Sequence, residues 1–269
     1  MHSEKKMILS LQQREQVETA IRDAAEKMLE AANGKVFTKE GHSNFVTQGD
    51  LAVQNSLMDS LSKLVPEAVF FSEEKENEEL TDQPTWIIDP IDGTLNYIHR
   101  RNCSMISVGL CVGKVPVYGF AYNPYTDEMF TAALGGGAFL NGTPIHVSET
   151  PFEKSVVGIG TSPYNLELAE MSIQACYRFL TEGGDLRRTG SAVQDFCDVA
   201  CGRSEIFFEY SSSPWDFTAS ALIVTEAGGV FTKPLEGEVS FGKPGCVLAS
   251  NKPCLEKAQE IIRSCAGWK

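Results

Sequence analysis

The stretch Trp86-Ile87-Ile88-Asp89-Pro90-Ile91-Asp92-Gly93-Thr94-Leu95-Asn96-Tyr97 is the most informative part of the sequence. Its apolar start is typical of a buried strand, and the glycine after the second aspartate marks a turn. Two aspartates therefore lie where a strand gives way to a turn, and their carboxylates can face one point. Adjacent carboxylates repel each other, and burial increases the repulsion unless a cation lies between them. Because Mg²⁺ prefers oxygen ligands and often keeps a substrate phosphate among them, the stretch predicts a metal-dependent phosphate enzyme.

The turn itself offers a place for the phosphate. Gly93 and Thr94 can begin a short helix, and the free amide groups at a helix start attract anions such as phosphate. The same turn would hold a metal ion through Asp89, Asp92 and the carbonyl of Ile91. A metal ion and a phosphate would then meet at one point, as in-line attack on a phosphoryl group requires.

Length, charge and cysteine content narrow the class of protein. The 269 residues suffice for one large domain or two modest ones, and the composition is that of an ordinary globular protein. The net charge of −13 argues against a broad nucleic-acid footprint, and no apolar run is long enough to span a membrane. We therefore expect a cytoplasmic protein with no membrane partner and no direct nucleic-acid binding. The eight cysteines contain no Cys-x-x-Cys pair, so we expect packed free thiols rather than disulfides or a metal site.

Apolar periodicity and turn signals outline a mixed α and β chain. Helices are predicted at residues 11–32, 50–64, 166–180, 192–201, 216–227 and 254–264, and a mobile loop at residues 35–44. Strands are predicted at residues 68–71, 86–88, 104–112, 115–122, 129–133, 138–140, 155–160 and 206–209. The four strands after the aspartates are typical of an antiparallel meander. We expect the boundary between two parts of the chain at residues 149–154, where the meander gives way to mixed α and β elements.

Acidic residues follow apolar runs in three separate segments, namely Glu73-Glu74, the Asp89 and Asp92 pair, and Trp215-Asp216. Each group alone is weak evidence, because a carboxylate after a strand is more often a helix cap or a solvated turn residue. Asp216 in particular could simply cap the helix that follows it. The Asp-Pro-Ile-Asp-Gly-Thr string is more specific, because it combines two acids, a turn carbonyl and a tight glycine.

These motifs together resemble one family. Asp-Pro-Ile-Asp-Gly-Thr-Leu-Asn-Tyr follows Ser-Glu-Glu, and Pro-Trp-Asp-Phe-Thr-Ala-Ser-Ala-Leu-Ile-Val-Thr-Glu-Ala-Gly-Gly lies far downstream. In this order and spacing the motifs resemble the inositol monophosphatase family of Mg²⁺-dependent, lithium-sensitive phosphatases. The resemblance extends from the first predicted helix to the last. It implies an inositol-phosphate phosphatase, which is a phosphoric monoester hydrolase.

The resemblance also implies a role for each site residue. Two or three Mg²⁺ ions would be held by Glu73, Asp89, the Ile91 carbonyl, Asp92 and Asp216. Glu73 and Thr94 would activate the attacking water, with Asp50 supporting Thr94, while Gly93 and Thr94 would contact the phosphate. The substrate's hydroxyl groups would meet Gly190, Ser191, Ala192, Glu209 and Asp216. Glu74 and Lys39 would have supporting roles around the metal ions.

Other activities of the superfamily stay open alongside hydrolysis of inositol monophosphate or a similar small polyol or sugar phosphate. A fructose-1,6-bisphosphatase would need a basic group for its second phosphate, and Arg187 or Arg188 could supply it. A 3′-phosphoadenosine 5′-phosphate phosphatase usually has a basic residue after the threonine, where this chain has Leu95-Asn96-Tyr97. A non-enzymatic alternative is a partner in transcription antitermination, as in some bacterial relatives.

The resemblance implies a five-layer α-β-α-β-α sandwich of the sugar-phosphatase type, usually assembled as a homodimer. We expect residues 1–150 to form an N-terminal α+β half that carries the metal and phosphate motif. Residues 151–269 would form a C-terminal α/β half that completes the active site, so that both halves make one compact unit.

Overall fold

The structure, a computed structural model, describes residues 9–38, 45–163, 165–234 and 237–265. Its α-helices are α1 (Leu11–Glu30), α2 (Gln48–Leu64), α3 (Thr94–Ile98), α4 (Leu166–Glu182), α5 (Ala192–Ala200), α6 (Pro214–Glu226) and α7 (Leu255–Ser264). Its strands are β1 (Val36–Thr38), β2 (Phe45–Thr47), β3 (Val69–Ser72), β4 (Thr85–Asp92), β5 (Met105–Val112), β6 (Val115–Asn123), β7 (Glu128–Ala133), β8 (Gly137–Leu140), β9 (Thr143–Pro144), β10 (Val156–Ile159), β11 (Asp185–Arg187), β12 (Ile206–Ser212), β13 (Val230–Thr232) and β14 (Gly245–Ser250).

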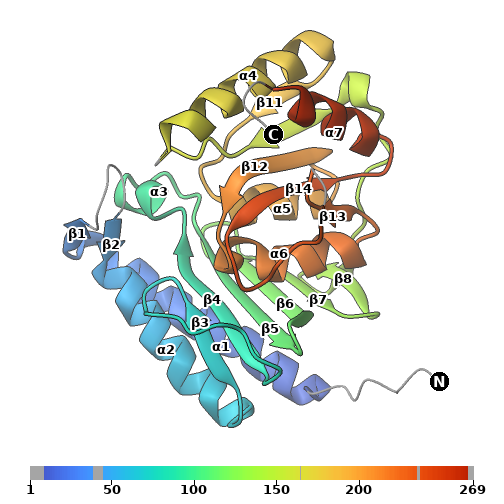
Figure 1. Cartoon of the computed structure of the whole chain (residues 1–269). Helices are drawn as coiled ribbons and strands as arrows, with labels where there is room; N and C mark the ends of the chain where they lie inside the picture. Colours follow the sequence, from blue (N-terminus) through green and yellow to red (C-terminus); the bar gives the residue numbers. More distant parts are fainter. Residues whose placement is uncertain (1–8, 39–44, 164, 235–236, 266–269) are drawn as a thin grey trace.

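Two sheets and three pairs of helices alternate as five layers (Figure 1). Helices α1 and α2 cover the outer face of a seven-stranded sheet, and α4 and α7 cover the outer face of a five-stranded sheet. Helices α5 and α6 lie between the two sheets and share one apolar core with both. The predicted five-layer sandwich is therefore confirmed. The boundary between residues 150 and 151 stays a prediction.

The seven-stranded sheet runs in the order β3-β4-β5-β6-β7-β8-β9. Strand β3 is parallel to β4, and every later neighbour is antiparallel, so the predicted meander is confirmed. All eight residues of β4 are buried, including its two aspartates. The pairing of β4 with β5 shifts register between Asp89 and Asp92, and such a bulge re-aims side chains at the end of a strand.

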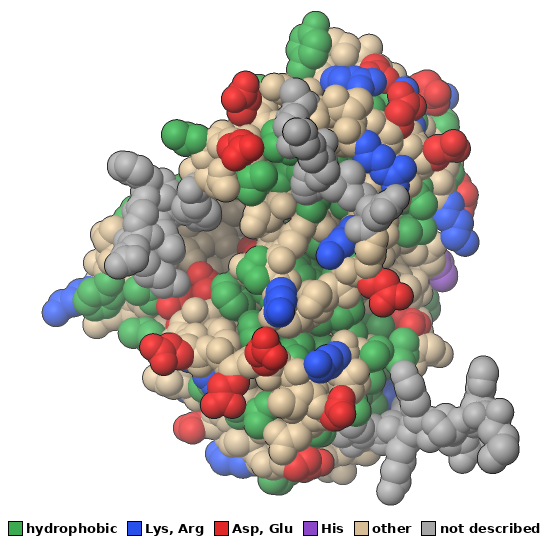
Figure 2. Space-filling view, viewed as in Figure 1, with side chains coloured by type: hydrophobic (Ala, Val, Ile, Leu, Met, Phe, Trp, Pro, Cys, Tyr) green, Lys and Arg blue, Asp and Glu red, His purple; other side chains and the backbone are tan. Residues whose placement is uncertain are grey.

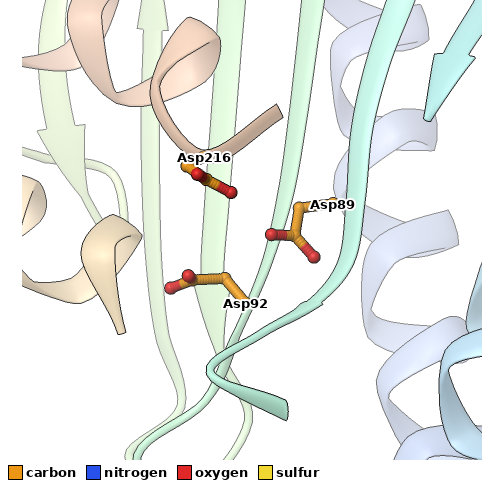
Figure 3. Close-up of side chains that lie close together, drawn as sticks. All are labelled: Asp89, Asp92 and Asp216. Carbon is orange, nitrogen blue, oxygen red and sulfur yellow. The ribbon is translucent and has the colours of Figure 1, made fainter. Parts of the chain in front are cut away.

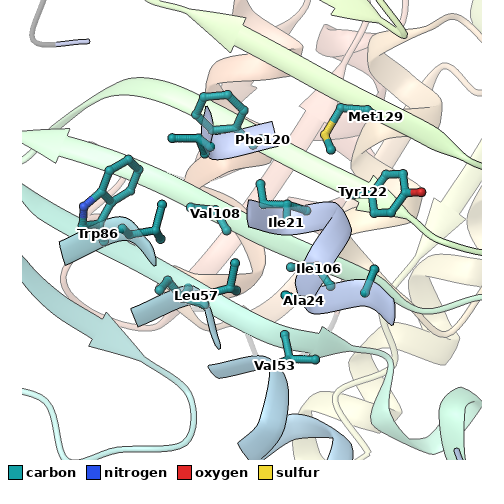
Figure 4. Packing of buried hydrophobic residues seen from close by; sticks show 14 of the residues in the cluster. Ile21, Ala24, Val53, Leu57, Trp86, Ile106, Val108, Phe120, Tyr122 and Met129 are labelled. Carbon is teal, nitrogen blue, oxygen red and sulfur yellow. The ribbon is translucent and has the colours of Figure 1, made fainter. Parts of the chain in front are cut away.

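Apolar side chains of α1 and α2 pack on this sheet (Figure 4). Ile21 of α1 and Leu57 of α2 are fully buried over Trp86 and Val108 of the sheet. Each such side chain contributes about 1.5–3 kcal/mol relative to an exposed position. This core fixes α2 against β4, and the beginning of α2 and the end of β4 both carry predicted site residues.

The five-stranded sheet runs in the order β11-β10-β12-β14-β13. Strand β10 is parallel to both β11 and β12, whereas β14 is antiparallel to β12 and β13. Strand β12 extends three residues beyond the predicted end at Glu209 and reaches Ser212. That extension brings the chain to the start of α6, where Asp216 lies.

The predicted loop at residues 35–44 is wrong in part. Val36–Thr38 forms β1 and pairs antiparallel with β2, the strand at Phe45–Thr47. Residues 39–44, including Lys39, lie outside the described residues.

Helix α6 lies against the seven-stranded sheet at two glycines. A side chain at Gly119 of β6 would place its Cβ 2.5 Å from the carbonyl oxygen of Ala219, and one at Gly109 of β5 would meet Thr218 at 2.8 Å. The absence of side chains thus lets α6 approach the sheet closely.

Among the described residues we find no helix with both the length and the apolar character needed to cross a membrane.

Candidate metal and phosphate site

Three aspartates from two distant parts of the chain meet in one cavity. Asp89 and Asp92 come from the end of β4, and Asp216 comes from the first turn of α6 (Figure 3). One carboxylate oxygen from each lies within 4.8 Å of the others. The cavity has a volume of about 490 Å³, and Figure 2 shows a hollow in the surface with acidic side chains in it. The structure thus brings together acids that the sequence separates by more than a hundred residues.

Asp92 is held by the beginning of α5. Its carboxylate accepts hydrogen bonds from the backbone amides of Ala192 at 3.2 Å and Val193 at 3.0 Å, and from the hydroxyl of Ser191. Ser191 also caps α5 through the amide of Gln194. Negative charge is favourable at a helix N-terminus, so α5 orients Asp92 and partly stabilises its charge.

Asp216 both caps α6 and faces the other two aspartates. It closes a capping box with Ser213, whose amide donates to the Asp216 carboxylate at 2.8 Å. The interpretation of Asp216 as a helix cap is therefore correct, but it is incomplete. Asp89 is held in a similar way, because its carboxylate accepts the Ile91 amide at 3.0 Å.

Burial and mutual repulsion disfavour the charged forms of these three acids. The pKa of Asp89 is raised well above its usual range, first by burial and then by Glu73 and Asp92. The pKa of Asp216 is raised in the same sense by burial and by Asp92. Burial raises the pKa of Asp92 to about 6, against hydrogen bonds from Ser191 and α5 that favour its charge. A cation between the three carboxylates would remove this penalty.

Thr94, the first residue of α3, lies beside this cluster. Its hydroxyl is 3.1 Å from the Ile91 carbonyl oxygen and 3.5 Å from a carboxylate oxygen of Asp50. Gly93, just before it, has a φ of 83°, a left-handed conformation that favours glycine. The predicted helix start at Gly93 and Thr94 is thus confirmed.

Asp50 is fully buried in the first turn of α2. The amide and hydroxyl of Thr47 both donate to one oxygen of its carboxylate, at 2.7 Å and 2.5 Å. The other oxygen faces Thr94. This capping box makes α2 begin at Gln48, earlier than the predicted start at Asp50. Burial raises the pKa of Asp50 to about 6.

Two further predicted acids, Glu73 and Glu74, lie in the turn after β3. Glu73 lines the cavity just after β3, and its charge raises the pKa of Asp89 and Asp216. Its carboxylate is not part of the group that meets within 4.8 Å. Glu74 does not line the cavity, but its charge contributes to the raised pKa of Asp50.

The far side of the cavity is formed by β10, β12 and the segments that follow β10 and β11. Burial raises the pKa of Glu209 to about 7, against a hydrogen bond from the Ser162 backbone and the positive charge of Arg188, which favour ionisation. Gly160 makes room for Glu209, because a Cβ there would lie 2.3 Å from its carboxyl carbon. Gly190 also lines the cavity.

Sequence reasoning missed Asp195, a buried acid of α5 that also lines the cavity. Burial raises its pKa to about 8, against hydrogen bonds from Thr189 that favour its charged form. One feature of the sequence indicates Asp195, namely a carboxylate on the apolar face of the helix predicted at residues 192–201.

Asn96 was also missed, although its side-chain NH₂ group donates to the carbonyls of Cys103 at 2.7 Å and Thr189 at 3.0 Å. Asn96 thereby ties α3 to the segment before α5.

The donor set fits a hard divalent cation. It consists of oxygen atoms alone, from three carboxylates that are aimed at one another and buried or half-buried. Mg²⁺ prefers such ligands, whereas zinc and softer metals prefer nitrogen and sulfur. All eight cysteines are free thiols, and none lines the cavity.

Comparisons with known proteins agree with this geometry. The sequence profile of the inositol monophosphatase family matches residues 9–265. Inositol monophosphatase 1 of Solanum lycopersicum is 38% identical over 227 residues, which cover 81% of this chain and 82% of the relative. Human inositol monophosphatase 1 is 32% identical over 255 residues, covering 90% and 91% of the two chains. The extragenic suppressor protein suhB of Bartonella henselae superposes with a TM-score of 0.85 at 29% identity, over 93% of this chain and 98% of that one.

Proposed function

The chain belongs to the inositol monophosphatase family, and we propose that it is an Mg²⁺-dependent phosphatase of inositol monophosphate or a similar small polyol phosphate. The observation that carries this proposal is the meeting of Asp89, Asp92 and Asp216 within 4.8 Å. They meet in a cavity that also holds Thr94 and Glu73. The relatives from Solanum lycopersicum and human, both named inositol monophosphatase 1, support the substrate class.

The proposed metal ligands are Asp89, the Ile91 carbonyl, Asp92 and Asp216, with Glu73 completing the set. Bound Mg²⁺ would lower the pKa of a water molecule and stabilise charge on the phosphoryl oxygens. The chain's own contribution is orientation, since a backbone amide already binds each of the three aspartates.

Thr94 and Glu73 would prepare the attacking water. Asp50, held by Thr47, can accept the hydroxyl proton of Thr94. Because Thr94 lines the cavity, its hydroxyl oxygen could then accept a hydrogen bond from water. Glu73 would take the proton, because threonine is too weak a base to do so alone.

The other side of the cavity would recognise the alcohol part of the substrate. Glu209 can accept hydrogen bonds from hydroxyl groups, and Ser191 and Ala192 lie at the start of α5 beside Asp92. The Ala192 amide binds Asp92, so a contact with substrate would come from its carbonyl or its methyl group.

The decisive experiment measures phosphate release from inositol 1-phosphate with and without Mg²⁺. We expect turnover that depends on Mg²⁺ and is inhibited by millimolar Li⁺. A panel with fructose 1,6-bisphosphate and 3′-phosphoadenosine 5′-phosphate should give the highest kcat/KM for the inositol ester. A higher value for either of the other esters would overturn the proposed substrate class.

A second candidate activity, hydrolysis of a sugar bisphosphate, is favoured by Arg188. Among the described residues that line the cavity it is the only lysine or arginine, and it lies near Glu209. Arg187 instead pairs with Asp185 at 2.8 Å on the surface. If a second phosphate binds here, Arg188→Gln should raise KM for fructose 1,6-bisphosphate about tenfold, whereas the matched Arg187→Gln should not.

We also propose that the protein forms a homodimer through α4. Four large apolar side chains follow one exposed stripe of this helix at helical spacing, namely Leu166, Ile173, Tyr177 and Leu180. Ile173 and Tyr177 are 61% and 69% exposed, so the stripe can be buried against a second copy. Light scattering should give twice the chain mass of 29.4 kDa, and Tyr177→Glu should reduce it toward one copy.

A further inference from the structure

The two residues proposed to prepare the water come from different elements. Thr94 begins α3, and Glu73 follows β3 in a turn. In-line attack tolerates little misplacement of the nucleophile, so both must be held in a fixed relation. Helix α2 contacts both segments through two side chains on one of its faces, Asp50 and Gln54, which are four residues apart.

Gln54 binds the polypeptide on both sides of Glu73. Its side-chain oxygen accepts the hydroxyl of Ser72 at 2.5 Å, and its side-chain NH₂ group donates to the carbonyl of Glu74 at 3.4 Å. Gln54 is only 6% exposed and Ser72 is fully buried. A buried amide that satisfies one group before Glu73 and one group after it limits where Glu73 can move.

Asn77 closes the same turn from the other side. Its side chain accepts the Ser72 amide at 2.9 Å and donates to the Ser72 carbonyl at 2.8 Å. Ser72 is thus bound through its backbone by Asn77 and through its hydroxyl by Gln54. The backbone that leads into Glu73 has little freedom.

We propose that Gln54 is a positioning residue that sets Glu73 relative to Thr94, with α2 as the rigid connection between them. Asp50 fixes Thr94 at one point of the helix face, and Gln54 fixes the Glu73 turn one helical turn later. Both contacts therefore move together if α2 moves. The inference rests on the proposed function for its catalytic consequence, and on the proposed place of Glu73 among the metal ligands for its effect on cation binding.

The variant Gln54→Met tests this inference, because it keeps the side-chain length and removes both hydrogen bonds. We expect kcat for inositol 1-phosphate to fall on the order of 10²-fold with KM changed less than about threefold, since the water and not the substrate is misplaced. Mn²⁺ affinity, measured by calorimetry without substrate, should fall about tenfold, as when a group that orients a metal ligand is lost.

The matched control is Ser56→Ala on the same helix. It removes the hydrogen bond that Ser56 accepts from Lys27 at 2.7 Å, which lies away from the Glu73 turn. This variant should keep kcat and Mn²⁺ affinity. Ser72→Ala, which removes half of the Gln54 contact, should give a smaller loss in the same direction, and it decides the matter if Gln54→Met does not fold.

Unchanged Mn²⁺ affinity and kcat in folded Gln54→Met would overturn the proposal, and so would an equal loss in Ser56→Ala. If the wild-type protein hydrolyses none of the phosphate esters, the proposed function fails by itself. The Mn²⁺ titrations then still decide whether Gln54 positions Glu73.

Discussion

Each of the three clustered aspartates binds a backbone amide as well as facing its neighbours. Asp92 binds the start of α5, Asp216 binds Ser213, and Asp89 binds Ile91. These bonds orient the carboxylates before any cation arrives. This arrangement lowers the free energy of unfolding unless a cation lies between the carboxylates, because three nearby acids are kept where their charges repel.

Asp89→Asn should therefore lower turnover and raise stability. We expect turnover to fall by more than about 10²-fold, because one of the three clustered carboxylates is lost. In EDTA the midpoint of thermal unfolding should rise by about 2–4 °C, which corresponds to about 1 kcal/mol of relieved repulsion in a chain of this size. Calorimetry and a phosphate-release assay measure the two effects.

The exposed aspartate of α2, Asp59, supplies the control. Asp59→Asn removes the same charge from the protein but should change neither turnover nor the midpoint beyond the usual scatter of surface substitutions. An Asp89→Asn variant that keeps wild-type turnover would remove Asp89 from the proposed metal ligands.

Asp195 makes stability depend on pH. Burial raises its pKa from 3.8 to about 8, so the folded protein keeps a proton that the unfolded chain releases near pH 4. The unfolded state then binds fewer protons between about pH 4 and pH 8, and stability falls as pH rises through this window. Asp195→Asn should thus raise the midpoint of thermal unfolding relative to wild type, and the rise should be larger at pH 8 than at pH 4.5. At pH 4.5 the folded wild type and the folded variant both have a neutral side chain at this position. A difference that is constant with pH would contradict this account.

At the scale of elements, the acidic motif could be predicted because its signals are local. Asp89, Asp92 and the helix start at Thr94 follow from one continuous stretch whose apolar run, turn and glycine are read directly. The approach of Asp216 to that stretch depends on how β12 and α6 pack, which no local pattern encodes. Here the family resemblance, rather than periodicity, supplied the prediction.

Gly160, the residue after β10, lies against β12, which gives a prediction for substrate binding. Gly160→Ala would place a methyl carbon 2.3 Å from the carboxyl carbon of Glu209, so the Glu209 side chain must move. We expect KM for inositol 1-phosphate to rise about tenfold, which corresponds to a loss of about 1.4 kcal/mol of binding free energy. Mn²⁺ affinity should stay unchanged, because the three aspartates lie on other elements. A loss of Mn²⁺ affinity as large as the rise in KM would show a general disturbance of the cavity instead.

At the scale of the molecule, the five-layer order was predicted from the family resemblance, whereas apolar periodicity indicated only mixed α and β elements with a meander. Long helices such as α1 and α4 have clear apolar faces, whereas β11 and β13 are three residues each and carry too few positions for periodicity. Strand β1 is exposed along its length, so no buried alternation marks it. These strands form because neighbouring strands supply hydrogen bonds, which is a property of the whole fold.

The contact between the seven-stranded sheet and α6 determines where Asp216 lies in the site. Gly119→Ala would place a methyl carbon 2.5 Å from the Ala219 carbonyl oxygen, and backbone cannot move aside as a flexible side chain can. We expect about 1–3 kcal/mol of destabilisation from the overpacking, measured as a lower midpoint of thermal unfolding. Mn²⁺ affinity should fall in parallel, because α6 carries Asp216 toward Asp89 and Asp92. The matched Gly245→Ala in β14, where the nearest atom is 3.9 Å away, should leave both properties intact. If Gly119→Ala loses stability but binds Mn²⁺ as wild type does, the position of Asp216 does not depend on this contact.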